Sequence, residues 1–407
     1  MHLTKMTGVP YLAAVSAIAL VISAGGAHAA EQWLENLEPR TLKLADFSGD
    51  QNANFGAAMV KWEEAITEFT EGKITFENYW SASLLGALDT AEGVADGVAD
   101  IGLVLASYIP QEFPVGAWFY GFGSALTGST VHDVAAGGAT ALETAYTFQP
   151  LIDEFAEHNL KILQTTSTPP YNLLCNTPVS TLEDAKGKRM RTSGPVWADE
   201  VAAIGATSVS IAFNETYEAL QRGVIDCIGQ NPYQLASAMT YKDVAKEYVP
   251  VTLSHMQSSA WVMNLDTWNS FPPELQAFIN EQNIIAASNI WKTYLELEAK
   301  VGDLITAEEI RVNDVSELEP VIAEQRAKTV AAMAETAPST IENPQEEVDR
   351  YLERLDYWRQ VLVDQGHPIA ERSPAAIMDA FTGLSDVDLS GFIETYKEEA
   401  GPVIIGQ

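Results

Sequence analysis

The sequence predicts an α/β protein built as two lobes with a ligand-binding cleft between them. At 407 residues the chain is longer than one hydrophobic core usually serves, so two domains are expected. Segments typical of strands and of helices alternate near the N-terminus and again in the middle of the chain, which is the pattern of α/β units. Two such units in one chain predict two lobes.

The first unit alternates strand and helix from residue 41 onwards. Apolar residues in alternation predict a strand at 41–45, and apolar residues at helical spacing predict a helix at 54–70. A strand at 73–79 and a helix at 90–98 follow. Residues 101–105 are an uninterrupted apolar run, as expected for a central parallel strand buried on both faces.

The second unit repeats this alternation between residues 161 and 226. Its expected helices lie at 196–204 and 216–222. Its expected strands lie at 161–165, 171–175, 188–191, 207–209 and 224–226. The two units resemble each other in topology rather than in sequence.

The last third of the chain is predicted to be mainly helical. A strand at 258–264 returns to the first lobe, and the helix at 273–307 is too long for a typical single lobe. Residues 315–407 are helical and acidic. We expect them either to cover the second lobe or to support a homodimer.

Residues 1–30 have the features of a cleavable secretory signal. Lys5 provides the positive charge, residues 9–22 are apolar, and Ala27-His-Ala29 has the small residues of a cleavage site. No cysteine stands directly after that site, and no later segment reaches about 18 apolar residues, so neither a lipid anchor nor a membrane span is expected. The mature chain is expected to be exported and not embedded in a membrane.

The formal net charge is −33, from 23 basic and 56 acidic residues. This balance argues against nucleic acid as a partner, because phosphate binding needs clustered Lys and Arg. It is typical of a solvated acidic surface. An anionic ligand would gain nothing from this long-range field, so its capture must depend on short-range donors.

Arg191 is the strongest candidate for such a donor. It ends the stretch Thr181-Leu-Glu-Asp-Ala-Lys-Gly-Lys-Arg-Met-Arg191, which predicts a turn and a short strand that places a guanidinium at its carboxyl end. The carboxyl ends of parallel strands border the crevice where α/β folds bind small molecules, and a guanidinium fits a carboxylate. The alternative is a surface Arg191 paired with Glu183 or Asp184.

A second motif predicts a carboxamide at the neighbouring strand end. Tyr217-Glu-Ala-Leu-Gln-Arg-Gly-Val-Ile-Asp226 indicates a helix closed by Gly223 and then a strand, and Gly229-Gln-Asn231-Pro follows. In a parallel sheet both strand ends open on one crevice. Together these motifs predict a receptor for a small organic anion.

The order of these motifs is similar to that of the extracytoplasmic solute-binding component of tripartite ATP-independent periplasmic (TRAP) transporters, of the DctP type. Gly205-Ala206 lies between them, and Gly72-Lys-Ile74, Leu84-Leu-Gly86 and Glu92-Gly-Val-Ala-Asp-Gly-Val-Ala-Asp-Ile101 precede them in the family's order. The resemblance covers residues from about 40 to 335. It implies a type II-like periplasmic binding protein that closes over a small carboxylate and delivers it to the permease subunits in the membrane.

The resemblance also implies the division into lobes. The first lobe is expected to comprise residues 31–168 and 257–296, and the second to comprise 169–256 and 297–407. The helix at 273–307 is expected to brace both lobes. The C-terminal segment extends beyond the part that the resemblance explains.

The resemblance further implies particular ligand contacts in the second lobe. Arg191 corresponds to the carboxylate anchor, and Asn231 to the carboxamide that assists it. Because the spacing is one residue longer than usual, Gln230 is one alternative to Asn231, and the other is a loop Asn231 that only satisfies local backbone groups. Phe213 corresponds to an aromatic residue that lines the pocket, with core packing as its alternative. Tyr171 stands where many members have a second Arg, so a ligand with fewer anionic groups is expected.

Other ligand contacts are expected from strand ends and the loops after them. In the first lobe these candidates are Asp46, Phe47, Trp80 and Tyr108, and in the second lobe Trp197 follows Arg191 on the first turn of a helix. Aromatic residues here would stack on an organic ligand. Core packing is the alternative for each of them.

Cys175 and Cys227 are the two cysteines of the chain. Export permits a disulfide, and the family's fold implies that the strands before or at these residues are neighbours. A disulfide would then lock the wall of the pocket. The alternative is two buried free thiols.

The sequence contains none of the common catalytic or cofactor-binding motifs, and its histidines lack metal-ligand spacing. No enzymatic activity, cofactor or metal is therefore expected. Two alternatives to a transport receptor remain. One is a sensory receptor that presents its ligand to a signalling partner. The other is an exported hydrolase or lyase that uses carboxylates such as Asp46 and Glu215.

Overall fold

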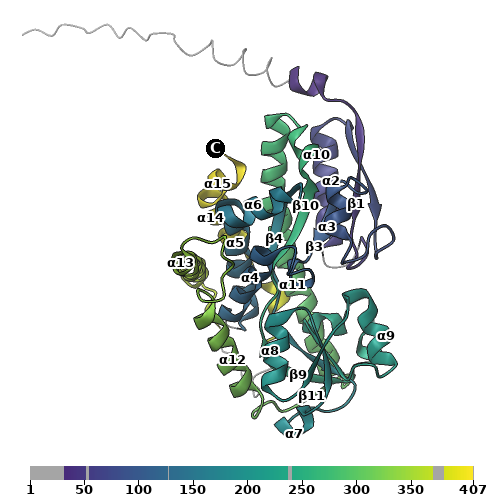
Figure 1. Ribbon diagram of the computed structural model, residues 1–407, viewed down its shortest axis with the longest axis vertical. Coiled ribbons are helices and arrows are strands. Elements are labelled where there is room, and N and C mark those ends of the chain that lie inside the picture. Colours follow the sequence, from purple (N-terminus) through teal and green to yellow (C-terminus); the bar gives the residue numbers. More distant parts are fainter. Residues whose placement is uncertain (1–31, 52–54, 127, 237–240, 370–379, 407) are drawn as a thin grey trace, which may run out of the picture. The chain divides into compact units, whose positions relative to one another are not determined.

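Two β-sheets with helices packed around them form the core of residues 39–407 in this computed structural model (Figure 1). The structure describes residues 32–51, 55–126, 128–236, 241–369 and 380–406. The described residues before this core, 32–38, belong to a separate unit. The expected signal at 1–30 lies outside the described residues.

The first sheet has five strands in the order β2-β1-β3-β10-β4. β1, β2 and β3 run parallel, and β10 runs antiparallel between β3 and β4. The strands are β1 (Arg40–Ala45), β2 (Ile74–Tyr79), β3 (Ile101–Val104), β4 (Leu160–Ser167) and β10 (Gln257–Asn264). All four residues of β3 are buried, as the apolar run predicted.

The second sheet has six strands in the order β11-β9-β5-β8-β6-β7. β6 is parallel to both β7 and β8, and β5 is antiparallel to β8 and β9. The strands are β5 (Tyr171–Cys175), β6 (Arg189–Thr192), β7 (Thr207–Ser210), β8 (Cys227–Gln230), β9 (Glu247–Leu253) and β11 (Arg311–Val312). Along the chain, β5 of the second sheet follows β4 of the first, and β10 of the first sheet follows β9 of the second. At both places the chain crosses from one sheet to the other.

One predicted strand was placed too early. The sequence analysis expected a strand at 224–226, but β8 begins at Cys227. Val224 is half exposed, and the Asp226 carboxylate binds the backbone N–H and the side chain of Arg189 at the start of β6. The backbone N–H of Asp226 also donates to the Arg189 carbonyl, whereas those of Val224 and Ile225 donate to Ala219 at the end of the preceding helix, so the chain joins the sheet only at Asp226.

Helices cover both sheets. Those between β1 and β4 are α2 (Gly56–Phe69), α3 (Thr90–Ala95), α4 (Pro114–Phe119), α5 (Thr130–Thr147) and α6 (Gln149–Glu157). Those between β5 and β8 are α7 (Leu182–Ala185), α8 (Pro195–Ala203) and α9 (Thr216–Gln221). α5 packs on β4 and β10 of the first sheet, and α8 packs on β6 and β7 of the second.

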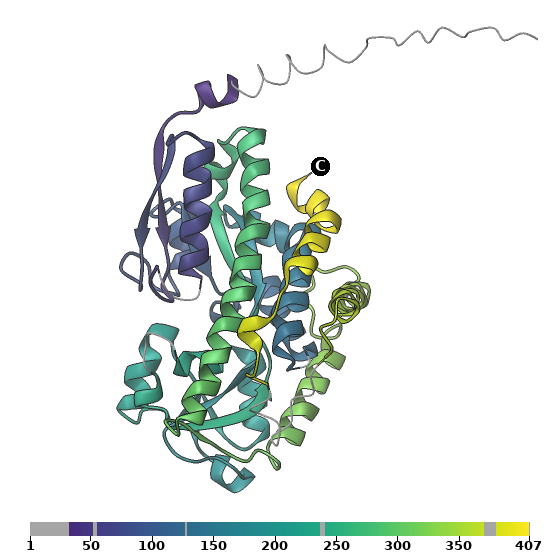
Figure 2. The same cartoon turned by 180° about the vertical axis from the view of Figure 1, so that it is seen from behind.

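A single long helix, α11 (Pro273–Thr306), follows β10 and the short α10 (Leu265–Asn269). It packs against α2, α5 and β4 on the side of the first sheet and against the turn Pro232–Leu235 that follows β8 in the second (Figure 2). It therefore contacts both lobes, as expected of a bracing helix.

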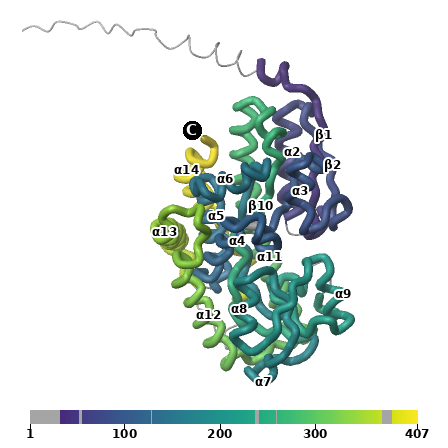
Figure 3. The backbone as a smooth tube through the Cα atoms, in the orientation of Figure 1, coloured from purple at the N-terminus to yellow at the C-terminus, as the bar shows by residue number. Residues whose placement is uncertain are grey.

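The C-terminal helices are α12 (Glu319–Ala332), α13 (Pro344–Asp364), α14 (Ser390–Glu399) and α15 (Gly401–Ile405). α12 packs against α8 and β9 and also against the turn Tyr120–Ala125 of the first lobe, whereas α13 packs on α5, and α15 on α5 and α11 (Figure 3). The sequence analysis assigned all of 297–407 to the second lobe. From these contacts we propose instead that α13 to α15 belong to the first.

Candidate functional site

Arg191 lies in β6, one residue before the strand ends, and its side chain is fully buried. Its Nε donates to the carbonyl of Ile211 at 2.9 Å, and its NH1 donates to the Ser193 hydroxyl at 2.7 Å. Its NH2 donates to the Tyr108 hydroxyl at 2.5 Å. These neutral acceptors hold the guanidinium in one orientation.

No carboxylate among the described residues lies within 4.0 Å of the Arg191 guanidinium nitrogens. The two acids that the sequence offered as partners are engaged elsewhere. Glu183 lies 3.6 Å from Lys186, and the Asp184 carboxylate accepts the backbone N–H groups of Ser180 and Thr181. Arg191 is thus a buried cation whose partners in the described chain are all neutral.

Tyr108 reaches Arg191 from the other lobe. It lies in the short 3-10 turn Ala106–Tyr108 directly after β3, and its ring also faces the guanidinium carbon at 5.8 Å. Arg191 belongs to the second sheet and Tyr108 to a loop of the first. Their hydrogen bond therefore joins the two lobes at the carboxyl ends of their strands.

Gln230 and Asn231 lie at the end of β8, next to the strand that carries Arg191. The Asn231 side-chain amide donates to the carbonyl of Pro169 at 2.6 Å, and its backbone N–H donates to the Gln230 side chain at 3.0 Å. Asn231 is therefore partly satisfied by the chain between β4 and β5. Both carboxamides border the same cavity, and neither alternative of the sequence analysis is eliminated.

A cavity of about 40 Å³ lies between the two lobes. It is lined from the first lobe and its loops, from the second lobe, and from α11. The lining residues are Phe47, Ser48, Phe55, Leu103, Leu105, Tyr108, Thr168, Tyr171, Phe213, Gln230, Asn231, Tyr233, Gln234, Met256 and Tyr294. This volume has room for roughly a few water molecules.

The cavity collects six of the ten ligand-contact residues predicted from sequence: Phe47, Tyr108, Tyr171, Phe213, Gln230 and Asn231. Arg191 stands behind it, one hydrogen bond away through Tyr108. Their role as ligand contacts stays a prediction.

Three other candidates do not line the cavity. Trp197 is fully buried, donates to the carbonyl of Ser254 at 2.7 Å and stacks on Tyr171, with ring centres 5.4 Å apart. Trp197 thus packs against Tyr171, which lines the cavity, without lining the cavity itself. Trp80 is partly exposed and also lies outside the lining.

Asp46 is the third. Its side chain is 1% exposed and accepts the backbone N–H of Ser48 at 2.6 Å and the Ser48 hydroxyl at 2.7 Å. Burial raises the pKa of Asp46 to about 6, although the bonds from Ser48 lower it. Asp46 therefore shapes the loop that carries Phe47 and Ser48 into the cavity.

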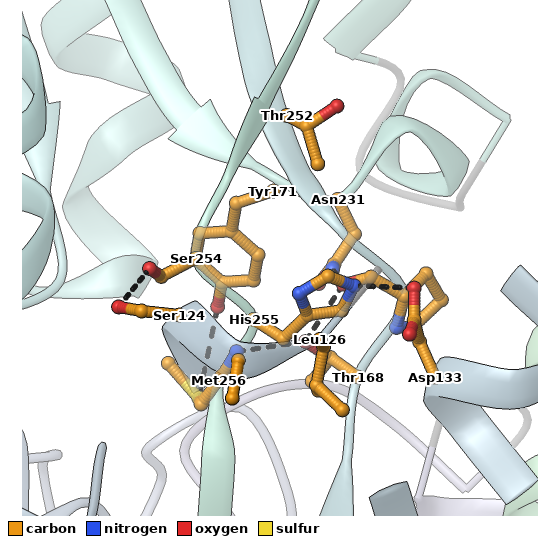
Figure 4. Close-up of polar contacts among 12 residues, drawn as sticks. Ser124, Leu126, Asp133, Thr168, Tyr171, Asn231, Thr252, Ser254, His255 and Met256 are labelled. Carbon is orange, nitrogen blue, oxygen red and sulfur yellow. Dashed lines mark hydrogen bonds and ion pairs between the residues drawn. The ribbon is translucent and has the colours of Figure 1, made fainter. Parts of the chain in front are cut away.

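The chain crosses between the sheets beside the cavity, and sequence reasoning missed the polar residues there. His255 Nε2 lies 3.0 Å from the Asp133 carboxylate, and the hydroxyls of Ser124 and Ser254 are 2.7 Å apart (Figure 4). The backbone N–H of Met256 donates to the Thr168 hydroxyl at 3.1 Å. The two crossing segments, 168–170 and 254–256, are thereby bound to each other and to the first lobe.

α8 of the second lobe and α12 of the C-terminal segment bind residues in or next to these crossing segments. The Glu200 carboxylate of α8 accepts the backbone N–H and the hydroxyl of Ser254. Arg326 of α12 donates to the carbonyls of Thr252, Ser124 and Leu126. Partners here are as many as 202 residues apart in the sequence, so no local pattern signals them.

A larger cavity of about 160 Å³ lies between α5 and α13, and it contains arginines. Arg354 is paired with Glu143 at 2.9 Å, and Arg350 is paired with Glu347. Each cation already has an acidic partner in the chain. This cavity is therefore less suited to an anion than the surroundings of Arg191.

The carboxylates offered for a hydrolase or lyase have different surroundings. Asp46 is buried and bonded to Ser48, whereas Glu215 is exposed. Among the residues that the structure describes, no cluster of His, Cys, Asp and Glu side chains could hold a metal ion. Within the same ranges, no helix has the length and apolar character required to cross a membrane.

Cys175 and Cys227 are register partners in the antiparallel pair β5 and β8, and their sulfur atoms are bonded at 2.00 Å. The disulfide lies at the end of the strands opposite to Gln230 and Asn172, which are paired with each other. It therefore links two strands of the wall away from the cavity.

Comparison with known proteins gives one family and one fold. The family model "DctP: Bacterial extracellular solute-binding protein, family 7" matches residues 44–337. A solute-binding protein of Roseobacter denitrificans is 30% identical over 264 residues, which cover 64% of this chain and 72% of that protein.

Two solved structures illustrate the fold. A TRAP solute-binding protein of Rhodoferax ferrireducens, in complex with copurified benzoate, has a TM-score of 0.67 at 19% identity, over 79% of this chain and 99% of that one. A TRAP periplasmic solute-binding protein of Desulfovibrio salexigens, with bound orotic acid, has a TM-score of 0.65 at 22% identity, over 78% and 99%. Both relatives share the two-lobed α/β architecture described above.

Proposed function

Because this chain belongs to the family-7 bacterial extracellular solute-binding proteins, the DctP family of TRAP transporters, we propose that it binds a small organic carboxylate between its lobes and delivers it to a TRAP membrane permease. The family and the two-lobed fold expected from the sequence motifs are confirmed. The members of this family are receptors for solutes rather than enzymes.

The observation that carries the proposal is the buried Arg191 guanidinium, which has only neutral partners in the described chain. Burying a cation without an anion is unfavourable, and a bound carboxylate would supply the missing charge. Solved relatives with bound orotic acid and copurified benzoate support a carboxylate as the ligand class.

Closure of the two lobes is the mechanism that fits this arrangement. The cavity is lined from both sheets, so a ligand there would contact both walls at once. Such a ligand stabilises the closed arrangement over an open one by the contacts that only the closed form provides. The crossing segments 168–170 and 254–256 are where this motion would bend the chain.

We place the protein outside the cytoplasm, in the periplasm. The family is described as extracellular, and residues 1–30 have the sequence of a signal peptide. Delivery to a permease follows from membership of the TRAP family and is part of the proposal.

The test replaces Arg191 with alanine. Ligands are first found by a thermal-shift screen of organic acids, and the affinity of the best one is then measured by calorimetry. A buried carboxylate that loses its charge partner binds about 2–5 kcal/mol less tightly, so Arg191→Ala should weaken binding roughly 30- to 4,000-fold.

Arg189→Ala is the matched control. Arg189 lies two residues away on the same strand, is paired with Asp226 and is largely exposed, so its loss changes the net charge equally without touching the cleft. Its variant should bind like wild type. An Arg191→Ala variant within threefold of wild type would refute the assignment.

A further inference from the structure

Tyr108 is the cavity-lining residue that is hydrogen-bonded to Arg191. Tyr108 is among the lining residues, whereas Arg191 and Ser193 are not. A guanidinium can only donate hydrogen bonds, so the Tyr108 oxygen is the acceptor in its 2.5 Å bond with Arg191. The hydroxyl proton is therefore directed to some other acceptor, and the nearby positive charge makes it a stronger donor.

The cavity wall itself carries no charge. Of its fifteen described lining residues, seven are aromatic, five are polar but neutral, and three are aliphatic. The aromatic ones are Phe47, Phe55, Tyr108, Tyr171, Phe213, Tyr233 and Tyr294. The only cation that the described hydrogen bonds connect to this wall is Arg191.

This wall discriminates between ligands by charge. One carboxylate can be received by Tyr108 and neutralised by Arg191 behind it. A second carboxylate would be buried against neutral side chains, which is strongly unfavourable. Asp46 also adjoins the lining residues Phe47 and Ser48, so a second negative charge on that side would meet a carboxyl group.

The wall also favours a shape. Aromatic side chains border the cavity from β5, from the loops after β1 and β3, and from α11, and aromatic surfaces pack well against a flat molecule. The neutral carboxamides of Gln230 and Asn231 can form hydrogen bonds with at most a few polar atoms of such a ligand.

We propose that the cleft takes a small monocarboxylate with a flat, uncharged remainder, and that the Tyr108 hydroxyl, held by Arg191, receives its acid group. This inference rests on the proposed function and specifies its substrate class. It adds a ligand-binding role for a first-lobe residue to the anchor in the second lobe.

The first experiment measures binding of matched acids to the full-length mature protein by thermal shift and calorimetry. Each pair differs by one carboxylate: benzoate and isophthalate, 2-furoate and 2,5-furandicarboxylate, butyrate and succinate. The aromatic monocarboxylates should bind best, and each dicarboxylate should bind at least roughly 30-fold more weakly than its partner. Equal or tighter binding of the dicarboxylates, or no binding of any monocarboxylate, overturns the proposal.

The second experiment measures the best monocarboxylate with Tyr108→Phe, which keeps the ring and removes the hydroxyl. Loss of one hydrogen bond to a charged group should weaken binding roughly 10- to 100-fold. Tyr217→Phe is the control, since the Tyr217 ring packs on Tyr241 and does not line the cavity. Unchanged or tighter binding by Tyr108→Phe overturns the role of the hydroxyl.

A double mutant separates this inference from the proposed function. In an Arg191→Gln background, the effect of Tyr108→Phe should shrink to within about threefold, because the hydroxyl acts together with the guanidinium. If Arg191→Ala abolishes binding of a dicarboxylate that the wild type prefers, the proposed function stands and this inference fails. If Arg191→Ala leaves binding unchanged, the proposed function itself fails.

Discussion

At the scale of single residues, buried ionisable side chains gather where the chain passes between the lobes. Glu200 is fully buried, and burial raises its pKa to about 7, while Ser254 and Arg326 lower it. His255 is also fully buried, and burial lowers its pKa although Asp133 opposes this effect. These groups make the stability of the crossing depend on pH.

Glu200→Gln tests this dependence. Because the folded state raises the Glu200 pKa from 4.5 to about 7, its contribution to stability is complete below pH 4.5 and is lost as the pH rises through about 7. The loss amounts to about 3 kcal/mol. Glutamine does not titrate and can still accept hydrogen bonds from Ser254. The free energy of unfolding of the variant, relative to that of wild type, should therefore rise by about 3 kcal/mol between pH 4.5 and 8.

The measurement is urea unfolding of both proteins at several pH values. Glu63 and Asp46, whose pKa values are also raised by burial, and His255, whose lowered pKa acts in the opposite sense, are present in both proteins. The difference between the two proteins therefore reports Glu200. A difference that stays constant across pH would contradict the prediction.

At the scale of elements, the site depends on three adjacent strands of the second sheet. β6 carries Arg191, β8 ends in Gln230, and β5 begins with Tyr171. β8 is parallel to β6 and antiparallel to β5, so the end of β8, the start of β5 and the end of β6 lie at one edge. The disulfide joins β5 and β8 at the other edge.

The disulfide gives a prediction for these strands. Alkylation of the unreduced, denatured protein should leave both cysteines unmodified in mass spectrometry, and two labelled thiols would refute the bond. Because the cysteines are 52 residues apart, a Cys175→Ala and Cys227→Ala double variant should lose about 4 kcal/mol of stability by the chain-entropy model. Ligand affinity should change much less, since the bond lies away from the cavity.

At the scale of the whole molecule, the net charge of −33 is the dominant electrostatic feature. Like charges repel one another in the folded state and less so in the expanded chain, which destabilises folding at low ionic strength. Of the positive charges in the described chain, Arg191 is among the few that are fully buried. It is therefore little affected by salt, whereas the surface is strongly affected.

Thermal unfolding at increasing NaCl concentration tests this view. From 20 to 500 mM NaCl the Debye length falls from about 20 to about 4 Å, so the melting temperature should rise by a few degrees. Most of the rise should occur below about 200 mM, because screening saturates whereas general salt effects continue linearly. A flat or falling melting temperature would contradict the prediction.

Much of the fold could be predicted because it depends on local patterns. The strands at 41–45 and 171–175 and the helix at 273–307 agree with β1, β5 and α11 to within one residue. The strand expected at 224–226 was placed too early, since the backbone N–H groups of Val224 and Ile225 bond the helix end at Ala219 rather than a neighbouring strand. The packing of α13 on α5, from which we propose a different lobe for the C-terminal helices, has no local signal either, because nothing in α13 itself indicates this partner.

The candidate site divides in the same way. Residues at strand ends, such as Arg191, Gln230 and Tyr108, could be named because a strand end is recognisable in the sequence. Trp197 could not be separated from the pocket residues, since its burial behind Tyr171 depends on the packing of α8. The pairing of His255 with Asp133 had no local signal at all.

The sequence by itself determined the family, the alternation of strands and helices, and the position of a guanidinium at a strand end, because each of these is written in residue types at short spacing. The tertiary structure alone decided that Arg191 is buried without an acidic partner in the described chain, and that it is hydrogen-bonded to Tyr108, a cavity-lining residue of the other lobe. Those facts depend on how two sheets meet across residues 83 positions apart, and no local pattern carries that information.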